Sequence, residues 1–289
     1  MTLFHTVILS GGGMLGCAHV GFLDYLQQNN KLVMRNIVGT SVGSLVGLWL
    51  ACGMQCKEMM ELLCSMNSSL LKVSDDGIAS LSHLYGLDDG EYFSAFIMDS
   101  LLSIGVDPQI TFRQLYSTKH IRLVVVICNV SSGNAEYVDY DTYPHMSIVD
   151  AVRASCSIPF VVGPFRSGGG DKLWVDGGLI DNYPIEWTCR TFGTHGIIGC
   201  QLVSWEITKD VQNFGEYLLC LMGCLLRKGI DGLPYTVRVD CSEASVFDFD
   251  CVVGIRQKLY DLGFSCTREY VNCKLLSAGP TTHKRSYSM

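Results

Sequence analysis

Apolar runs and helical patterns alternate along this chain. Phe4 to Leu9 has the composition of a buried strand, and a glycine cluster separates it from a helical pattern over Met14 to Gln28. Asn36 to Val38 predicts a second, short strand, and the helical stretches after it end near Cys52 and Met66. A strand followed by a helix and then another strand is the unit that builds a parallel sheet.

The same alternation continues to the end of the chain. Further strands are predicted at 121–129, 135–139, 173–176, 196–203 and 235–239, and further helices from Thr111, over 147–156 and 211–228, and between 248 and 276. The expected fold is therefore α/β, with a mostly parallel central sheet and helices on both faces. No repeat, linker or low-complexity tract interrupts the sequence, which predicts a single domain over residues 1–289 with a flexible tail at 281–289. The stretch from Asn67 to Asp89, rich in Ser, Asp and Gly, is the candidate for a mobile covering loop.

Composition excludes several classes of protein. With 48% hydrophobic and 17% charged residues the chain is too apolar to be disordered. Its formal net charge of −7 argues against nucleic acid as a partner, because phosphate binding needs a basic surface. The first residues do not have the pattern of a signal peptide, so we expect a cytoplasmic protein whose 14 cysteines are free thiols.

Short sequence patterns argue against a metal-binding protein and against a membrane-spanning protein. No Cys-x-x-Cys pair, EF-hand loop or His-Glu-x-x-His motif occurs, and we expect no metal to be bound. The uncharged stretch from Ile37 to Met54 contains turn signals, so a transmembrane helix is not expected there. The uncharged run from Tyr217 to Leu226 is too short to span a bilayer and predicts a buried helix, with lining of an apolar pocket or contact with a bilayer as the alternative.

The first candidate for chemistry is a glycine loop. Gly11, Gly12, Gly13, Met14 and Gly16 stand between a predicted strand and a predicted helix, where backbone N–H groups attract negative charge. The spacing matches the G-x-G-x-x-G pattern of dinucleotide-binding folds, and it equally suits a loop that holds the oxyanion of a reaction intermediate. The dinucleotide interpretation expects a carboxylate about twenty residues further on, where this chain reads Val-Met-Arg-Asn.

A second glycine turn carries a serine. The pentapeptide from Gly39 to Gly43 follows a predicted strand and precedes a predicted helix, as the G-x-S-x-G nucleophile elbow requires. Gly39 and Gly43 have a steric part in this motif, since side chains there would collide with the neighbouring strand and helix. The pattern indicates Ser41 as a candidate nucleophile, with a chance match in a glycine-rich turn as the alternative.

A serine hydroxyl needs a base to activate it. In the chain order of an α/β-hydrolase the histidine comes last, which leaves His195, in a loop before a predicted strand, and His283, in the tail. Neither has a setting typical of a catalytic base. Asp176 stands at the end of a predicted strand, directly before Gly177 and Gly178, where an ordinary β-turn is the alternative interpretation.

Together these segments resemble the patatin-like phospholipase family. The resemblance rests on the glycine loop, the G-x-S-x-G serine, the Asp-Gly-Gly motif, and the connecting segments 153–160, 163–165 and 182–184, and it covers residues 4–187. It implies a patatin-like three-layer sandwich and a lipid acyl hydrolase of the phospholipase A or lysophospholipase type. It further implies phospholipid or another acyl lipid as substrate, transient contact with a membrane surface, and no cofactor.

The resemblance also implies roles for single residues. Ser41 would attack the ester carbonyl, Asp176 would take its proton and return it to the leaving alcohol, and amides of the glycine loop would hold the oxyanion. A carboxylate is a weak base for an alcohol, and burial that raises its pKa would help. The family usually has a basic residue where this chain has Leu15, and either packing of the helix start or loss of a cation near the loop accounts for the difference.

Two other functions stay open on the sequence alone. One is a dinucleotide-binding oxidoreductase built on the glycine loop. The other is a lipid-binding module that keeps the fold but has no catalytic turnover.

Overall fold

The bounds of the strands and helices come from a computed structural model, which describes residues 3–67, 81, 83–166, 172–204, 217, 221, 224, 233–242, 244 and 253–277. The strands are β1 (Phe4–Leu9), β2 (Leu32–Thr40), β3 (Gly86–Asp88), β4 (Arg122–Asn129), β5 (Asn134–Val138), β6 (Phe160–Val162), β7 (Phe165–Arg166), β8 (Leu173–Asp176), β9 (Ile197–Val203) and β10 (Thr236–Asp240). The helices are η1 (Gly13–Gly16), α1 (Cys17–Gln28), α2 (Val42–Cys52), α3 (Cys56–Ser65), α5 (Glu91–Ser103), α6 (Phe112–Lys119), α7 (Ile148–Ser155), α8 (Gly178–Asp181), α9 (Ile185–Phe192) and α11 (Val253–Ser277).

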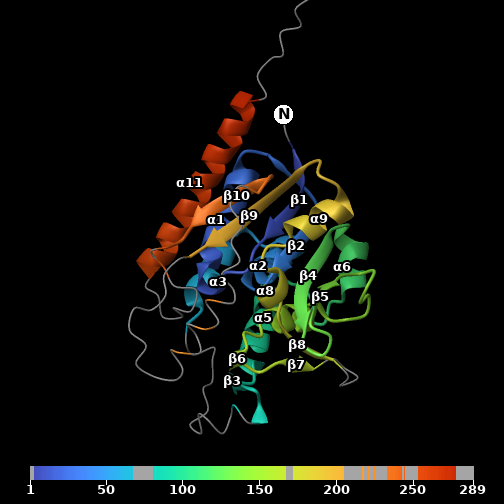
Figure 1. The fold of residues 1–289 in the computed structure, drawn as a ribbon. Helices are drawn as coiled ribbons and strands as arrows, with labels where there is room; N and C mark the ends of the chain where they lie inside the picture. Colours follow the sequence, from blue (N-terminus) through green and yellow to red (C-terminus); the bar gives the residue numbers. More distant parts are fainter. Residues whose placement is uncertain are drawn as a thin grey trace, which may run out of the picture.

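One central sheet runs through the molecule (Figure 1) in the order β10-β9-β1-β2-β4-β8-β7. The strands from β10 to β4 are parallel to one another, whereas β5 and β8 run antiparallel to β4, and β7 runs antiparallel to β8. The short strands β3 and β6 pair in a separate two-stranded sheet. The sheet is thus mostly parallel, with an antiparallel end.

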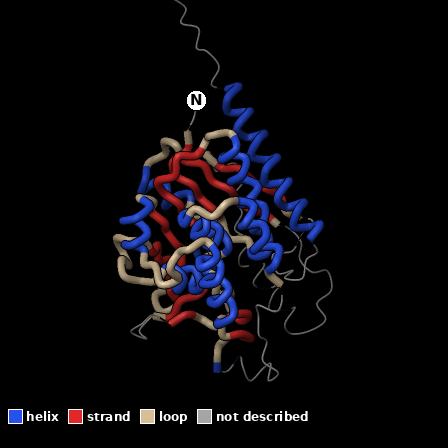
Figure 2. Tube along the Cα trace, turned by 180° about the vertical axis from the view of Figure 1, so that it is seen from behind, coloured by secondary structure: helices blue, strands red, loops and turns tan. Residues whose placement is uncertain are grey.

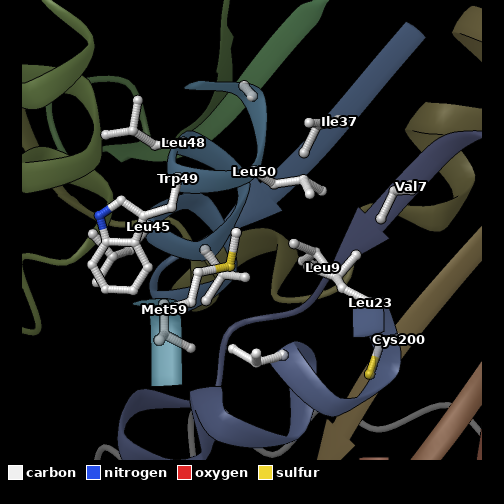
Figure 3. Close-up of a cluster of buried hydrophobic side chains, with 14 of the residues drawn as sticks. Val7, Leu9, Leu23, Ile37, Leu45, Leu48, Trp49, Leu50, Met59 and Cys200 are labelled. Atoms are coloured by element: carbon white, nitrogen blue, oxygen red, sulfur yellow. The ribbon is translucent and has the colours of Figure 1, made fainter. Parts of the chain in front are cut away.

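Successive side chains of a strand point to opposite faces of the sheet. In this molecule helices pack against the side chains on both faces. Val7 of β1 belongs to the main core, which also contains α1 and α2 side chains (Figure 3). The neighbouring Ile8 packs on the other side, against Ile185 at the start of α9, and Val124 of β4 packs near Trp187 of the same helix. Seen from behind, helices of the main core lie over the sheet (Figure 2). The predicted α/β fold with helices on both faces is confirmed.

Two strands meet end to end beside β4. Thr40 at the end of β2 pairs with Val126, and Asp176 at the end of β8 pairs with Ile127, the next residue of β4. The strand β5 takes the other edge of β4 over the same residues, so β2 and β8 share one edge. Since β2 runs parallel to β4 and β8 antiparallel, their carboxyl ends face each other. The residues that follow β2 and that end β8 are therefore brought together.

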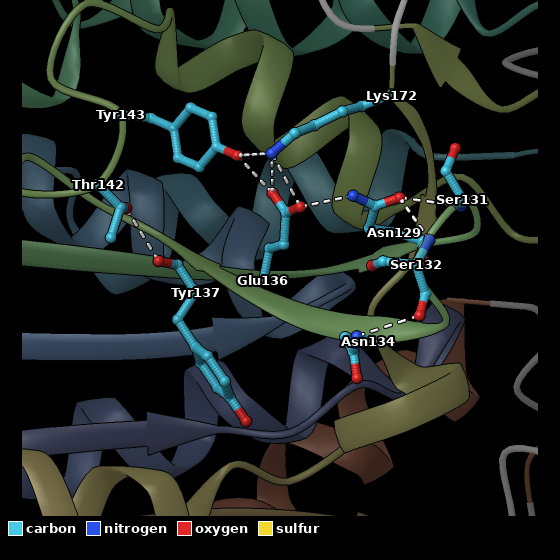
Figure 4. A network of polar contacts seen from close by, with 9 residues as sticks. All are labelled: Asn129, Ser131, Ser132, Asn134, Glu136, Tyr137, Thr142, Tyr143 and Lys172. Atoms are coloured by element: carbon cyan, nitrogen blue, oxygen red, sulfur yellow. Dashed lines mark hydrogen bonds and ion pairs between the residues drawn. The ribbon is translucent and has the colours of Figure 1, made fainter.

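A polar network fixes the far end of β8. Glu136 of β5 accepts hydrogen bonds from Asn129 Nδ2 at 2.6 Å, from the Tyr143 hydroxyl at 2.6 Å, and from Lys172 Nζ at 3.1 Å (Figure 4). Lys172 directly precedes β8, so these contacts tie the beginning of that strand to the β4–β5 hairpin. Burial opposes ionisation of Glu136, but these donors together hold its pKa below the ordinary value.

The predicted elements differ from the observed ones mainly at their ends and in short segments. The predicted strand 36–38 is part of the longer β2, and the helix predicted from Met14 begins as the 3-10 helix η1 before α1. The helix predicted from Thr111 is α6, and its capping box forms, with Thr111 N–H donating to Gln114 Oε1 at 2.8 Å. The elements α5, α8, α9, β3, β6 and β7 were not predicted.

Several predictions fall on residues outside the described ranges. These are the helix over 211–228, apart from three of its positions, the tail at 281–289, and most of the proposed covering loop between Asn67 and Asp89. Within the described part, none of the helices combines the length and the apolar character needed to cross a bilayer.

Candidate active site

Ser41 lies in a sharp turn between β2 and α2. Its φ of 53° and ψ of −127° place a non-glycine residue in a left-handed conformation, which costs energy and is common at functional sites. Gly39 and Gly43 permit this turn. A Cβ on Gly39 would come within 2.5 Å of the Gly43 carbonyl oxygen, and a Cβ on Gly43 would come within 2.6 Å of the Ser10 carbonyl oxygen and collide with that of Leu9.

The Ser41 hydroxyl donates a hydrogen bond to Asp176, with 2.6 Å between Oγ and Oδ2. The two residues are 135 positions apart in the sequence, and both are buried. The meeting of β2 and β8 beside β4 explains the contact. Gly177 follows at once because a side chain there would collide with the Val126 carbonyl oxygen of β4. Two of the predicted site residues are thus in direct contact.

The Asp176 carboxyl is held in one orientation and kept from water. Its Oδ1 accepts the Gly178 backbone N–H at 2.7 Å, and its own N–H donates to the Ser157 carbonyl oxygen at 2.9 Å. Burial raises the pKa of Asp176 to about 6, although the hydrogen bonds from Ser41 and Gly178 act in the opposite direction. A carboxylate with a raised pKa is a stronger base than an exposed one.

His195, one of the two histidines considered as an alternative base, does not lie beside Ser41. His195 stacks on His5, with ring centroids 5.8 Å apart. His5 lies at the beginning of β1, whereas Ser41 follows the end of the neighbouring parallel strand β2. His195 is therefore at the opposite end of the sheet from Ser41. His283 lies outside the described residues.

The backbone N–H groups of the glycine loop differ in their hydrogen bonding. Among the described residues, none accepts a hydrogen bond from the N–H of Gly12, Gly13 or Met14. Gly13 and Met14 also line the same pocket as Ser41. Leu15, at the position where the family usually has a basic residue, is 1% exposed and belongs to the main core. Leu15 thus packs in the core at the start of the helix.

Gly11 and Gly16 have a different place in the loop. The Gly11 N–H already donates to the Asn182 carbonyl oxygen at 2.9 Å, and a side chain on Gly11 would collide with Asn182 Oδ1. A Cβ on Gly16 would come within 2.6 Å of Val42 Cγ2, where η1 meets α2. Both glycines allow close packing, and the Gly11 N–H is already engaged, unlike those of Gly12, Gly13 and Met14 among the described residues.

An apolar pocket of about 60 Å³ opens beside Ser41. Its lining is almost entirely hydrophobic and includes Met14, Leu45, Met66, Phe93, Ile158 and Val162. Cys156 also lines it, and burial raises the pKa of that thiol well above its ordinary range, so the thiol stays protonated. An apolar space next to a nucleophilic oxygen suits the hydrocarbon end of an ester.

One wall of the pocket is held by a buried arginine. Arg153 of α7 donates to the carbonyl oxygens of Asp89, at 2.6 Å, and of Gly90 and Gly163, both at 3.1 Å. It also donates to the Ser157 hydroxyl at 2.5 Å. These bonds connect the β3–β6 pair and the start of α5 to α7. Sequence reasoning included Arg153 in the resemblance but gave it no structural role.

Ser155 also lies in a segment quoted for the resemblance, but its contact with the backbone of the elbow was not predicted. The signal for it was available: Ile148, Val152 and Ser155 follow the apolar spacing of one helix face, and a hydroxyl on such a face needs a buried partner. Its partner is Ser41 N–H, which donates to Ser155 Oγ at 2.8 Å.

Neither a metal site nor a dinucleotide site has its expected residues here. Among the described residues, no three His, Cys, Asp or Glu side chains gather where they could hold a metal ion. The residues about twenty positions after the loop, where a dinucleotide fold carries its ribose-binding carboxylate, are Val33 to Asn36 of β2 and include no carboxylate. The loop beside β1 therefore lacks the carboxylate that a dinucleotide site expects.

A family model described as patatin-like phospholipase matches residues 7–187, more than half of the sequence. The chain belongs to the patatin-like phospholipase family. The chain shares about a quarter to a third of the aligned residues with two relatives. It is 27% identical over 192 residues to the probable lipid hydrolase 463L of Invertebrate iridescent virus 6, which covers 63% of this chain and 62% of that protein. It is 30% identical over 232 residues to the triacylglycerol lipase ptl3 of Schizosaccharomyces pombe, which covers 72% of this chain and 46% of the lipase.

Solved structures agree with this patatin-like fold. VipD from Legionella pneumophila superposes with a TM-score of 0.69 at 15% sequence identity, covering 93% of this chain and 67% of VipD. The type III effector protein ExoU superposes with a TM-score of 0.51 at 16% identity, covering 96% of this chain and 54% of ExoU. At such identities the likeness concerns the fold. The chain spans less than two thirds of the length of 463L, ptl3 and ExoU.

Proposed function

We propose that this chain hydrolyses fatty-acyl esters of lipids, with Ser41 as nucleophile and Asp176 as the single base. The observation that carries the proposal is the 2.6 Å hydrogen bond from the Ser41 hydroxyl to a buried Asp176 carboxylate. A nucleophile and a base within hydrogen-bond reach are the first requirement for covalent catalysis. Membership of the patatin-like family, and relatives named a probable lipid hydrolase and a triacylglycerol lipase, support the same class of reaction.

In the first half of the reaction, Ser41 Oγ attacks the carbonyl carbon of the ester while its proton passes to Asp176 Oδ2. The carbonyl oxygen becomes an oxyanion and receives hydrogen bonds from the N–H groups of Gly12, Gly13 and Met14. Donors that are in place before the charge develops supply a large part of such catalysis. The tetrahedral intermediate then releases the alcohol, whose oxygen takes the proton from Asp176, and the acyl group stays on Ser41.

In the second half, water attacks the acyl carbonyl carbon and gives its proton to Asp176. Collapse of this intermediate releases the fatty acid, and Ser41 Oγ takes the proton back. The Gly178 N–H bond to Oδ1 keeps Oδ2 directed at the serine throughout. Every proton is thus transferred through one carboxyl group.

The pocket indicates the chemical class of the substrate. Its hydrophobic lining accepts an acyl chain, and the elbow places Ser41 at its edge. Phospholipids and lysophospholipids are the substrates that the family suggests, and such lipids reside in aggregates. The proposed enzyme therefore makes transient contact with a membrane surface, and its chemistry uses the residues above without a cofactor.

Release of fatty acid from phosphatidylcholine vesicles and lysophosphatidylcholine micelles tests the proposal. We expect Ser41→Ala and Asp176→Asn to lose at least a thousandfold in rate, as is typical for loss of a nucleophile or its base. Asp99→Asn, an exposed change on α5, serves as the matched control and should release fatty acid at the parent rate. Equal release by the parent and Ser41→Ala would overturn the proposal. Binding of lipid without release by any variant would identify a non-catalytic module.

A further inference from the structure

His19 is a buried histidine that the proposed reaction does not use. It lies in the first turn of α1, its side chain has no solvent exposure, and its Nε2 is 2.8 Å from the Ser10 carbonyl oxygen. A carbonyl oxygen only accepts, so Nε2 carries the proton. Burial lowers the pKa of His19 to about 4, and the ring is therefore neutral at physiological pH.

The carbonyl that His19 holds is the point where the glycine loop touches the nucleophile elbow. A Cβ on Gly43 would come within 2.6 Å of the Ser10 carbonyl oxygen, which means that this oxygen already rests against the elbow backbone. Ser10 directly precedes the glycine loop, and Gly43 lies two residues after Ser41. The Ser10 carbonyl oxygen is thus one of two backbone oxygens, with that of Leu9, through which this segment packs against the elbow.

Other bonds fix the same stretch from its remaining sides. Ser10 Oγ accepts the Leu202 N–H at 2.9 Å and donates to the Gly11 carbonyl oxygen at 2.9 Å. The Gly11 N–H donates to the Asn182 carbonyl oxygen at 2.9 Å. His19 adds the bond that ties the start of the loop to the helix that the loop leads into. Without that bond the loop keeps its connections to β9 and to the Asn182 segment but loses the one to α1.

We propose that His19 is a positioning residue, which holds the amides of Gly12, Gly13 and Met14 at the distance from Ser41 that oxyanion binding requires. The inference rests on the proposed function, since the oxyanion is that of the ester reaction. His19 touches Ser10 and acts through it. A shift of these donors by a fraction of an ångström weakens stabilisation of the oxyanion without affecting the base.

The second ring nitrogen of His19, Nδ1, supports a role in which only the Nε2–H group is used. Nδ1 of His19 is buried and has no hydrogen-bond partner among the described residues. An unpaired buried acceptor destabilises the fold, so a leucine would be the more stable choice if the position served packing alone. Protonation of Nδ1 would bury a charge and a donor without an acceptor. The site therefore uses His19 as a neutral Nε2–H donor.

Three variants separate this role from a general structural one. His19→Leu removes the donor, whereas His19→Gln restores an N–H group that reaches about as far as Nε2. Thr267→Val is the matched control, because Thr267 is also fully buried and donates to a backbone carbonyl, that of Gly263 within α11. Amide hydrogen exchange at Gly11 and Leu15, both hydrogen-bonded within the loop region, reports on loop order without requiring activity.

We expect exchange at these two amides to rise at least tenfold in His19→Leu and to stay near the parent rate in His19→Gln and Thr267→Val. With a soluble short-chain ester, we expect kcat of His19→Leu to fall about 10- to 100-fold with little change in KM, and His19→Gln to recover most of it. In the parent protein, ¹⁵N spectra of the histidine rings should show His19 as the neutral Nε2–H tautomer at pH 7.

Unchanged exchange in His19→Leu, unchanged kcat in an active protein, or an Nδ1–H tautomer in the parent would each overturn the inference. If the parent itself neither hydrolyses esters nor reacts with a fluorophosphonate probe, the proposed function fails. The exchange and ¹⁵N results on the folded protein still decide whether His19 orders the loop. Failure of the two proposals is thus distinguishable.

Discussion

The Ser41 backbone N–H donates to the Ser155 hydroxyl over 2.8 Å, and that hydroxyl donates onward to the Val126 carbonyl oxygen over 2.7 Å. The strained turn at Ser41 directs its N–H away from α2, and Ser155 supplies the buried partner that this group needs. The hydroxyl also connects the elbow to β4, the strand beside which β2 and β8 meet. The nucleophile turn therefore depends on α7 as well as on its own glycines.

Loss of the Ser155 hydroxyl, which links the Ser41 N–H to the Val126 carbonyl oxygen, should weaken both the fold and the proposed activity. Ser155→Ala leaves the Ser41 N–H and the Val126 carbonyl without their partner, so we expect the free energy of unfolding to fall by about 1–3 kcal/mol. We also expect kcat to fall about tenfold, because the Ser41 turn loses a constraint. Chemical denaturation and ester hydrolysis measure the two effects. Ser103→Ala, which removes a part-buried hydroxyl on α5, is the control and should change neither by a comparable amount.

The raised pKa of Asp176 predicts the pH dependence of activity. The carboxylate must be ionised to accept the serine proton, so kcat/KM should rise about tenfold per pH unit below pH 6 and level off above it. A profile of soluble-ester hydrolysis between pH 4 and 8 measures this. An inflection near the ordinary carboxyl pKa of about 4 would show that burial does not tune the base.

The same shift predicts that the base destabilises the fold. The pKa of Asp176 is higher in the folded chain than in the unfolded one, so its contribution to stability is complete below about pH 4 and is lost as the pH rises through 6. At pH 7, Asp176→Asn should therefore unfold with a free energy about 1–3 kcal/mol higher than the parent. The difference should vanish near pH 4. Denaturant titrations at both pH values measure the difference, with the exposed change Asp99→Asn of α5 as the control.

Two helical glycines, Gly43 in the elbow and Gly254 in α11, differ in the space available for a side chain. A Cβ on Gly43 would press into the carbonyl oxygens of Leu9 and Ser10, which are backbone atoms of β1 and the glycine loop. Gly43→Ala should cost about 3 kcal/mol or more, or prevent folding. Gly254→Ala, at a helical glycine of α11 with open space around it, should be neutral or stabilise by up to about 1 kcal/mol. Thermal unfolding of both variants makes the comparison, and equal effects would contradict the close approach.

The alternation of strands and helices was enough to predict the mostly parallel sheet and the position of Ser41 in a strand-to-helix turn. It did not predict that β8 enters antiparallel to β4, because a four-residue apolar strand carries no signal of its direction. That direction is what brings Asp176 to Ser41. Their proximity was expected only from the family resemblance, and the structure supplies the physical reason for it.

Buried polar residues were the harder part of the site to predict. The sequence presents His19 as one of seven histidines, and its part becomes visible only when the loop carbonyl it contacts is placed. Ser155 similarly has its partner 114 residues away. The Gly11 N–H is likewise engaged by a distant residue, through the carbonyl oxygen of Asn182. Such long-range hydrogen bonds follow from the packing of elements and leave little trace in local patterns.

Covalent labelling of Ser41 is the decisive experiment on the Ser41–Asp176 pair. A fluorophosphonate reacts with a serine only when a base withdraws its proton, and its phosphoryl oxygen occupies the place of the oxyanion. We expect one probe adduct per chain, located at Ser41 by mass spectrometry of peptides. Labelling should be abolished in Ser41→Ala and slowed at least a hundredfold in Asp176→Asn. A folded parent that forms no adduct at Ser41, or an Asp176→Asn variant that labels at the parent rate, would contradict it.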